Sequence, residues 1–147
     1  MIVVDANLLI YSYDISSADH KKSVAWLEEV LSGTEAVGLP WPCICAFVRI
    51  VTNRRLTGMR VDLNAALEAV EEWLRSPNVQ ILVPGDGHWP LFRRMVIQGQ
   101  APGPLVSDAE IAALAIENGA VLHTADRDFA RFPGSLVRSL VCNRVRI

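Results

Sequence analysis

Five short apolar runs alternate with helix-forming segments along this 147-residue chain, and this alternation is the feature that most restricts its fold. The first run, Ile2–Val4, is apolar at every position, as in a strand that is covered on both faces. The later runs lie at 36–39, 79–83, 120–124 and 136–142. Strands separated by helices predict an α/β fold, a three-layer α/β/α domain with a central parallel sheet. At this length, residues 1–147 are expected to form a single domain.

The segments between these runs have the spacing of amphipathic helices, which are expected at 19–32, 44–52, 62–75, 89–98 and 107–118. Asp62 is a favourable N-cap for the third helix. Ser107 and Glu110 have the spacing of a capping box at the start of the last helix. The inner face of the third helix is predicted to consist of Leu63, Leu67, Val70 and Leu74.

The overall charge excludes a protein whose whole surface attracts nucleic acid. The formal net charge is −2 and the pI is about 5.9, so any nucleic-acid partner must meet a local basic patch. The candidates for contacts with phosphates are Arg54, Arg55, Arg60, Arg93 and Arg94. These arginines suit a solvated face equally well, and the two interpretations stay open.

The cysteines and the hydropathy pattern indicate a cytoplasmic protein. Cys43, Cys45 and Cys142 lack the spacing of zinc ligands, and an odd number without a secretory signal is typical of a reduced protein. Cys43 and Cys45 are predicted to be small buried hydrophobes. The longest apolar stretch, at 36–48, is too short to cross a bilayer and is interrupted by two prolines. No membrane partner is therefore expected.

Three aspartates follow the ends of predicted strands, where parallel α/β folds bind their ligands, and a fourth lies at the start of a predicted helix. Asp5 directly follows the first strand, and Asp126 and Asp128 follow the fourth in VLHTADRDF. Asp108 lies in the first turn of the helix that leads into the fourth strand. Carboxylates at one edge of a sheet repel one another unless a cation lies between them, and oxygen ligands suit Mg²⁺ or Mn²⁺. The pattern predicts a divalent-cation site.

Each acid also has a structural interpretation. Asp108 suits the positive end of a helix dipole, and Asp126 and Asp128 suit turns. Asp5 is harder to explain structurally, because apolar residues flank it on both sides.

Other α/β proteins that use acids or phosphate loops are excluded by missing residues. Asn7 stands where an aspartyl phosphatase needs its second aspartate. A response-regulator receiver needs a lysine late in the chain, and none follows Lys22. The turn after the first strand has no glycine, and the P-loop pattern is absent, which excludes a dinucleotide site and a P-loop.

Three segments together resemble the PIN-domain ribonucleases: IVVDANLLIY, LPWPCICAFVRIVTNRR and SDAEIAALAIENGAVLHTADRDFARFPG. More narrowly, they resemble the toxins of VapBC toxin–antitoxin pairs, and the resemblance covers nearly the whole chain. It implies a small α/β/α domain and a magnesium-dependent endoribonuclease that cleaves RNA. It also implies a cognate VapB-type antitoxin and a homodimer.

Carried over by position, the resemblance assigns the catalytic acids to Asp5, Asp108, Asp126 and Asp128. The first three are expected to bind Mg²⁺, or alternatively Mn²⁺, which would orient a water and lower its pKa. Asn7 and Thr124 match polar positions that support the site in this family.

One departure concerns a glutamate that the family usually has in the helix after the second strand, near Cys45 or Ala46. Residues 36–61 contain no acid; Arg49 stands in this helix and is given a supporting role. Glu110 is a rival for the place of the missing ligand. The departure keeps open whether one or two metal ions bind. It also keeps open a catalytically silent PIN-like module that binds RNA or protein, and a metal-dependent nuclease that acts on DNA.

Overall fold

The computed structural model describes residues 1–57 and 61–140, which form a five-stranded parallel sheet flanked by helices. The strands are β1 (Ile2–Val4), β2 (Val37–Pro40), β3 (Val79–Leu82), β4 (Val121–Thr124) and β5 (Leu136–Ser139). The predicted α/β class and central parallel sheet are confirmed. The predicted continuation of the last strand to Cys142, and the candidate Arg60, lie outside the described residues.

The strand order β3-β2-β1-β4-β5 places β1 at the centre of the sheet. Val3 of β1 pairs with Gly38 of β2 on one side and with Leu122 of β4 on the other. The chain builds outward from β1 through β2 to β3, and then crosses to the opposite side of β1. The winding therefore reverses between β1 and β4. A crevice forms at such a reversal, at the carboxyl ends of the strands, and Asp5 and Asp126 follow these two ends.

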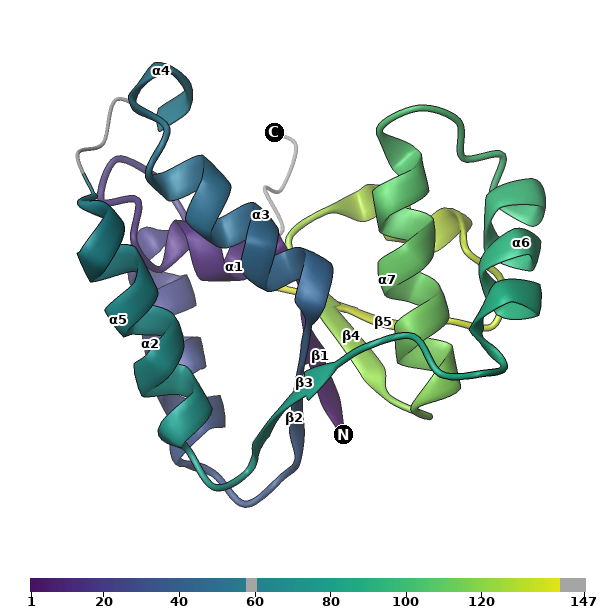
Figure 1. Ribbon diagram of the computed structural model, residues 1–147, viewed down its shortest axis with the longest axis horizontal. Helices are drawn as coiled ribbons and strands as arrows, with labels where there is room; N and C mark the ends of the chain where they lie inside the picture. The colour runs from purple at the N-terminus through teal and green to yellow at the C-terminus, as the bar shows by residue number, and fades with distance from the viewer. Residues whose placement is uncertain (58–60, 141–147) are drawn as a thin grey trace, which may run out of the picture.

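The helices cover both faces of the sheet. They are α1 (Ala6–Tyr11), α2 (His20–Ser32), α3 (Trp41–Val51), α4 (Arg54–Thr57), α5 (Leu63–Arg75), α6 (His88–Gln98), α7 (Leu105–Glu117) and the 3-10 helix η1 (Arg127–Arg131). Figure 1 shows α6 and α7 as a pair on one side of the strands, and α2 and α5 together on the other. Coverage of both faces explains why β1 is apolar at every position.

The core combines the buried central strands with an aromatic cluster. Val3 and Val4 have no exposed surface. Trp73 of α5 packs against Phe47 of α3 with ring centroids 4.7 Å apart, and Tyr13 contacts both rings edge-on. Such aromatic pairs contribute about 0.5–1.5 kcal/mol each beyond the area that they bury. The cluster fixes α5 and α3 to the segment that follows α1.

The predicted inner face of α5 was wrong for its three leucines but confirmed at Val70, and its N-cap was confirmed: Asp62 accepts a hydrogen bond from the backbone N–H of Asn64. The buried residues of α5 are Ala66, Ala69, Val70 and Trp73. The exposed leucines of the predicted face are Leu63, Leu67 and Leu74. Trp73 decides the orientation, because its ring joins the aromatic cluster and turns the two small alanines toward the core.

Two further predictions were wrong. Helix α7 begins at Leu105, directly after Gly103 (φ 59°) and Pro104, so Ser107 lies inside its first turn and forms no capping box with Glu110. Cys43 is buried as predicted, but Cys45 is exposed on α3. The short helices α1, α4 and η1 were not predicted, since each is too short to show a helical period. No helix in the described part of the chain is long and apolar enough to cross a membrane.

Candidate active site

The buried carboxylate of Asp5 is held by the hydroxyl of Thr124 across the reversal between β1 and β4. Thr124 Oγ1 donates a 2.6 Å hydrogen bond to Asp5 Oδ2, and neither residue is more than 5% exposed. Thr124 Oγ1 also accepts hydrogen bonds from Asn7 Nδ2 (3.2 Å) and from the backbone N–H of Asp126 (2.9 Å). A hydroxyl has one donor and two acceptor sites, so these three bonds use all of them. Thr124 therefore joins the ends of the two strands.

Asn7 makes a second connection between the same segments. Its Oδ1 accepts a hydrogen bond from the backbone N–H of Ala125 at 3.2 Å, while its Nδ2 donates to Thr124. Because Asn7 lies in the first turn of α1, the side-chain amide ties this helix to the segment after β4. An aspartate at this position would lack the N–H donor. The two predicted supporting residues thus hold the backbone around Asp5 and Asp126.

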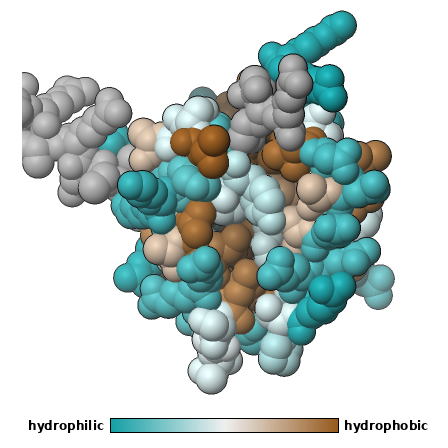
Figure 2. Space-filling model, turned by 90° about the vertical axis from the view of Figure 1, so that its left-hand side faces the viewer, coloured by the Kyte–Doolittle hydropathy of each residue, from teal (hydrophilic) through white to brown (hydrophobic). Residues whose placement is uncertain are grey.

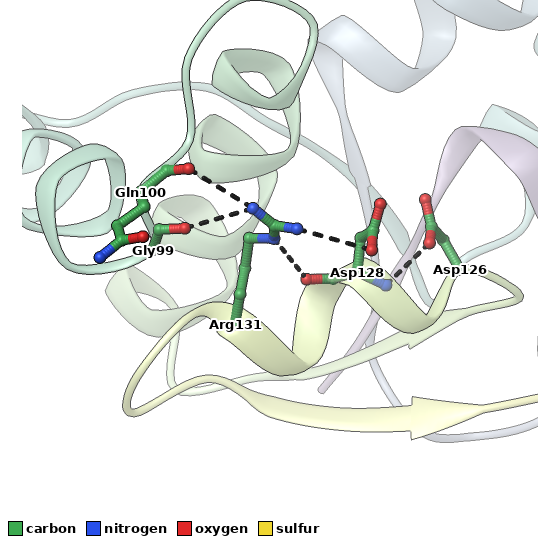
Figure 3. A network of polar contacts seen from close by, with 5 residues as sticks. All are labelled: Gly99, Gln100, Asp126, Asp128 and Arg131. Atoms are coloured by element: carbon green, nitrogen blue, oxygen red, sulfur yellow. Dashed lines mark hydrogen bonds and ion pairs between the residues drawn. The ribbon is translucent and has the colours of Figure 1, made fainter.

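Asp126 and Asp128 both belong to the turn that opens η1. Asp126 Oδ1 accepts a 2.8 Å hydrogen bond from the backbone N–H of Asp128, as Figure 3 shows. This is the Asx-type turn bond that the sequence left open. It does not exclude cation binding, because a carboxylate has two oxygens with about four lone-pair sites. The side chain of Asp128 is 55% exposed and lies at the rim of the site.

Asp108 approaches from the first turn of α7, where the sequence placed it. Its pKa is raised from 3.8 to about 6, mainly by burial and also by the charges of Asp126 and Asp128, while the charge of Arg131 acts in the opposite direction. Mutual repulsion of this kind requires the carboxylates to lie close to one another. The structure thus brings acids from α7 and from the turn after β4 to one place.

Asp5 is part of the same electrostatic group. Its pKa is raised from 3.8 to about 6, mainly because the carboxylate is buried, while the hydrogen bonds from Thr124 and from the backbone of Ala6 act in the opposite direction. The charges of Asp108 and Asp126 add to the rise. The three carboxylates predicted to bind metal therefore repel one another at the carboxyl edge of the sheet.

Helix α3 forms another side of the site, and only one of its cysteines faces the acids. Burial raises the pKa of the Cys43 thiol well above its usual value, and the charges of Asp5, Glu110 and Asp108 contribute. Cys45 is exposed. Residues three apart share a helix face, so the half-buried Ala46 lies on the side of Cys43. Of the two positions considered for the missing glutamate, the structure favours Ala46.

Arg131 is a member of the site that was not predicted from the sequence. Its Nη2 lies 3.6 Å from Asp128 Oδ1, and its charge lowers the pKa of Asp108. The signal was available in DRDFAR, where an aspartate and an arginine three residues apart lie side by side on a helical turn. The predicted Arg49 is exposed in the last turn of α3, and its supporting role stays a prediction.

This donor set fits a hard divalent cation. The carboxylates come from three separate elements, repel one another and include one that is almost fully buried, and a cation would relieve this repulsion. Within residues 1–57 and 61–140, no three Asp, Glu, His or Cys side chains come close enough to enclose an ion by themselves. A cation here would take its other ligands from water or substrate, which is usual for Mg²⁺.

Comparison with known sequences identifies the family. A model of the PIN domain matches residues 2–135. Ribonuclease VapC37 of Mycobacterium tuberculosis is 38% identical over 134 residues, which cover 91% of this chain and 93% of that protein. Ribonuclease VapC43 of the same organism is 37% identical over 132 residues, or 90% of each chain.

Comparison with solved structures agrees on the fold. VapBC2 from Rickettsia felis, bound to a DNA fragment from the promoter, superposes with a TM-score of 0.66 at 14% identity, covering 95% of this chain and 98% of that chain. VapC20 of Mycobacterium tuberculosis, a toxin that cleaves the sarcin–ricin loop, gives 0.65 at 20% identity, covering 88% and 93%. The match to the PIN-domain model and the sequence identity to the two ribonucleases show that the chain belongs to the PIN-domain family and, within it, to the VapC proteins.

Proposed function

We propose that this protein is a metal-dependent endoribonuclease and the toxin of a toxin–antitoxin pair. The observation that carries the proposal is the Asp5 carboxylate, which is 5% exposed and lies within electrostatic range of Asp108 and Asp126 at the reversal of the sheet. A buried carboxylate among other carboxylates is unfavourable unless a cation accompanies it. The relatives VapC37 and VapC43 are named ribonucleases, which supports RNA as the substrate.

In this proposal, Asp5, Asp108 and Asp126 hold Mg²⁺. When bound, the ion supplies activation of a water nucleophile and stabilisation of charge on the phosphate. Thr124 orients the Asp5 carboxylate through its 2.6 Å hydrogen bond and favours its ionised form. Asp128 is exposed enough to meet solvent and substrate, and its carboxylate can accept a proton from a water at the rim.

The proposal is tested with the purified chain, a mixed RNA substrate and a matched single-stranded DNA. Treatment with a chelator is expected to stop RNA cleavage, and Mg²⁺ or Mn²⁺ is expected to restore it. Cleavage that persists in the chelator would exclude the metal-dependent mechanism. RNA binding without cleavage at any metal concentration would favour the silent module, and cleavage of DNA alone would favour the third candidate.

Restoring an acid at position 46 is expected to strengthen metal binding. Ala46 lies on the face of α3 that Cys43 presents to Asp5 and Asp108, so Ala46→Glu adds a carboxylate beside them. Mn²⁺ should bind the variant about fivefold more tightly or better, a gain of roughly 1 kcal/mol, in a calorimetric titration.

Cys45→Glu is the matched control for this variant, because it adds the same carboxylate to the exposed face of α3. Equal gains for both variants would mean that only general charge matters. If neither variant changes the affinity while Glu110→Gln removes binding, the site is already complete and Glu110 has replaced the missing ligand.

The face of α2 and α5 offers a groove for an antitoxin. A cavity of about 660 Å³ there is lined by apolar, acidic and serine side chains. The apolar lining consists of Val24, Leu27, Leu31 and Trp73, and the acidic residues are Glu28 and Glu72. Figure 2 shows hydrophobic side chains running down this face between hydrophilic borders. The groove suits an antitoxin segment with apolar anchors flanked by basic residues, and solved relatives such as VapBC2 contain both proteins.

Expression of the chain alone is expected to arrest bacterial growth, and co-expression of its antitoxin to relieve the arrest. Val24→Glu should reduce this relief by placing a charge in the apolar groove, while Ala25→Glu, on the exposed side of α2, should not. Relief that is equal for both variants would exclude the groove as the docking site. Normal growth with the unaltered chain alone would contradict the toxin assignment.

A further inference from the structure

The loop between α6 and α7 rests directly on the segment that closes η1. A Cβ atom at Gly99 would lie 2.7 Å from the ring of Phe132 and 2.7 Å from the carbonyl oxygen of Met95, so there is room only for glycine. Gln100 has a φ of 47°, the left-handed conformation that is unfavourable for a non-glycine residue. Such a conformation persists only where the surroundings hold it. The packing of the α6–α7 loop against the end of η1 is therefore tight and well defined.

The guanidinium group of Arg131 adds hydrogen bonds between the α6–α7 loop and η1. Nη1 donates to the carbonyl oxygens of Gly99 and Gln100, both at 3.4 Å. Nε donates to the backbone carbonyl of Asp128 at 3.2 Å, and Nη2 lies 3.6 Å from Asp128 Oδ1. Figure 3 shows the group lying between the loop on one side and the acidic turn on the other. One side chain thus joins two segments that are about thirty residues apart in the chain.

Both of these segments carry acids of the active site. The loop leads into α7, whose first turn holds Asp108, and η1 begins directly after Asp126 and includes Asp128. The negative charges of Asp126 and Asp128 act on Asp108, so repulsion pushes the first turn of α7 and the turn of η1 apart. Arg131 opposes this separation because its hydrogen bonds join the α6–α7 loop to η1.

We propose that Arg131 is a positioning residue that fixes Asp108 relative to Asp126 by clamping the α6–α7 loop to η1. The part of the proposal that concerns RNA cleavage rests on the proposed function; the part that concerns the clamp does not. The alternative, that Arg131 binds an RNA phosphate, predicts a different pattern of effects.

The clamp depends on the shape of the guanidinium group as well as on its charge. Its planar fork donates in several directions at once, so one group reaches both segments. A lysine has the same charge on a single ammonium group and cannot span them. Arg131→Lys therefore retains the positive charge near the site and removes the connection. For a phosphate contact, by contrast, lysine is an adequate replacement.

The experiment compares Arg131→Lys with Arg127→Lys, the same substitution at an exposed arginine of the same turn. In the Arg131 variant, Mn²⁺ affinity is expected to fall about tenfold or more, as for other residues that orient metal ligands. Amide hydrogen exchange at residues 99–108 should become faster without metal. For RNA cleavage, kcat should fall while KM stays within about twofold. The Arg127 variant should resemble the unaltered chain in all three measurements.

Gly99→Ala tests the same contact between the α6–α7 loop and η1 without changing a charge. Its methyl group would displace Phe132 or the loop, so a similar loss of Mn²⁺ affinity is expected, and the double variant should lose less than the product of the two single effects. A thermal melt shows whether each variant is folded.

Two results would overturn the clamp. The first is a folded Arg131→Lys variant whose Mn²⁺ affinity and amide hydrogen exchange are unchanged. The second is an Arg131→Gln variant with a raised KM and an unchanged kcat, in which lysine at the same position restores the KM. If the unaltered chain cleaves no RNA, the proposed function fails, yet the metal and exchange measurements still decide the role of Arg131.

Discussion

Asp5→Asn and Asp108→Asn are each expected to reduce RNA cleavage by at least about a hundredfold while the protein stays folded. Asparagine fills the same space but removes the negative charge that would hold the cation, and losing one preorganised electrostatic contact typically costs this much in rate. Asp5 offers the sharper test, because it is almost fully buried. The measurement is a single-turnover cleavage assay at saturating Mn²⁺. Near-normal cleavage by either variant would show that its residue is no metal ligand.

The same Asp5→Asn substitution should stabilise the metal-free protein at neutral pH. The pKa of Asp5 is raised from 3.8 to about 6 on folding, so the folded state favours the protonated acid. The stabilisation from this preference is complete below pH 3.8 and is lost as the pH rises through about 6. Above that pH the buried charge costs up to about 3 kcal/mol, and asparagine removes this cost.

Melting temperatures of the metal-free proteins check this expectation. Asp5→Asn should melt above the unaltered chain at pH 7.5, and the difference should shrink as the pH falls toward 4. Glu68→Gln, an exposed acid on α5, should show no such difference. A variant that melts lower than the unaltered chain at pH 7.5 would mean that the ionised carboxylate is stabilised in the fold even without metal.

The fold was largely predictable because its central strands have a pattern that few other structures share. Ile2–Val4 is apolar at each position, which requires cover on both faces, and the strand–helix alternation then implies a parallel sheet. The face of α5 was not predictable in the same way. Its leucines and its small alanines form two neighbouring apolar stripes, and the contact between Trp73 and Phe47 chooses between them. That contact joins distant parts of the chain.

The candidate site likewise contains residues that the local sequence predicts and residues that depend on contacts between distant segments. Asp5 and Asp126 were predicted because each follows the end of a strand, where the fold class itself predicts a ligand site, whereas Thr124 was predicted only through the family resemblance. Arg131 was missed because a lone arginine near a turn resembles any solvated residue. Its partners are backbone carbonyls of the distant α6–α7 loop, which no sequence pattern announces. The preference for Ala46 over Cys45 also needed the orientation of α3.

Thr124→Val is expected to reduce cleavage about 10- to 100-fold, the usual loss when a residue that orients a metal ligand is removed. Valine has nearly the shape of threonine but no hydroxyl, so it leaves the Asp5 carboxylate, the Asn7 amide and the Asp126 N–H without their shared partner. Buried polar groups left unpaired cost about 1–3 kcal/mol of stability. Unfolding by urea at pH 7.5 should show this loss.

The pH dependence of Thr124→Val separates the role of the hydroxyl from a general loss of packing. The hydrogen bond from Thr124 lowers the pKa of Asp5, so removing it should raise that pKa further above about 6. If cleavage needs ionised Asp5, the acidic limb of the rate profile should move to higher pH in the valine variant, and part of the lost activity should return as the pH rises. Thr124→Ser keeps the hydroxyl and loses only a methyl group, so its profile should match that of the unaltered chain. Equal profiles for valine and serine would mean that the hydroxyl does not control the charge of Asp5, and that Thr124 contributes only to the packing between β1 and β4.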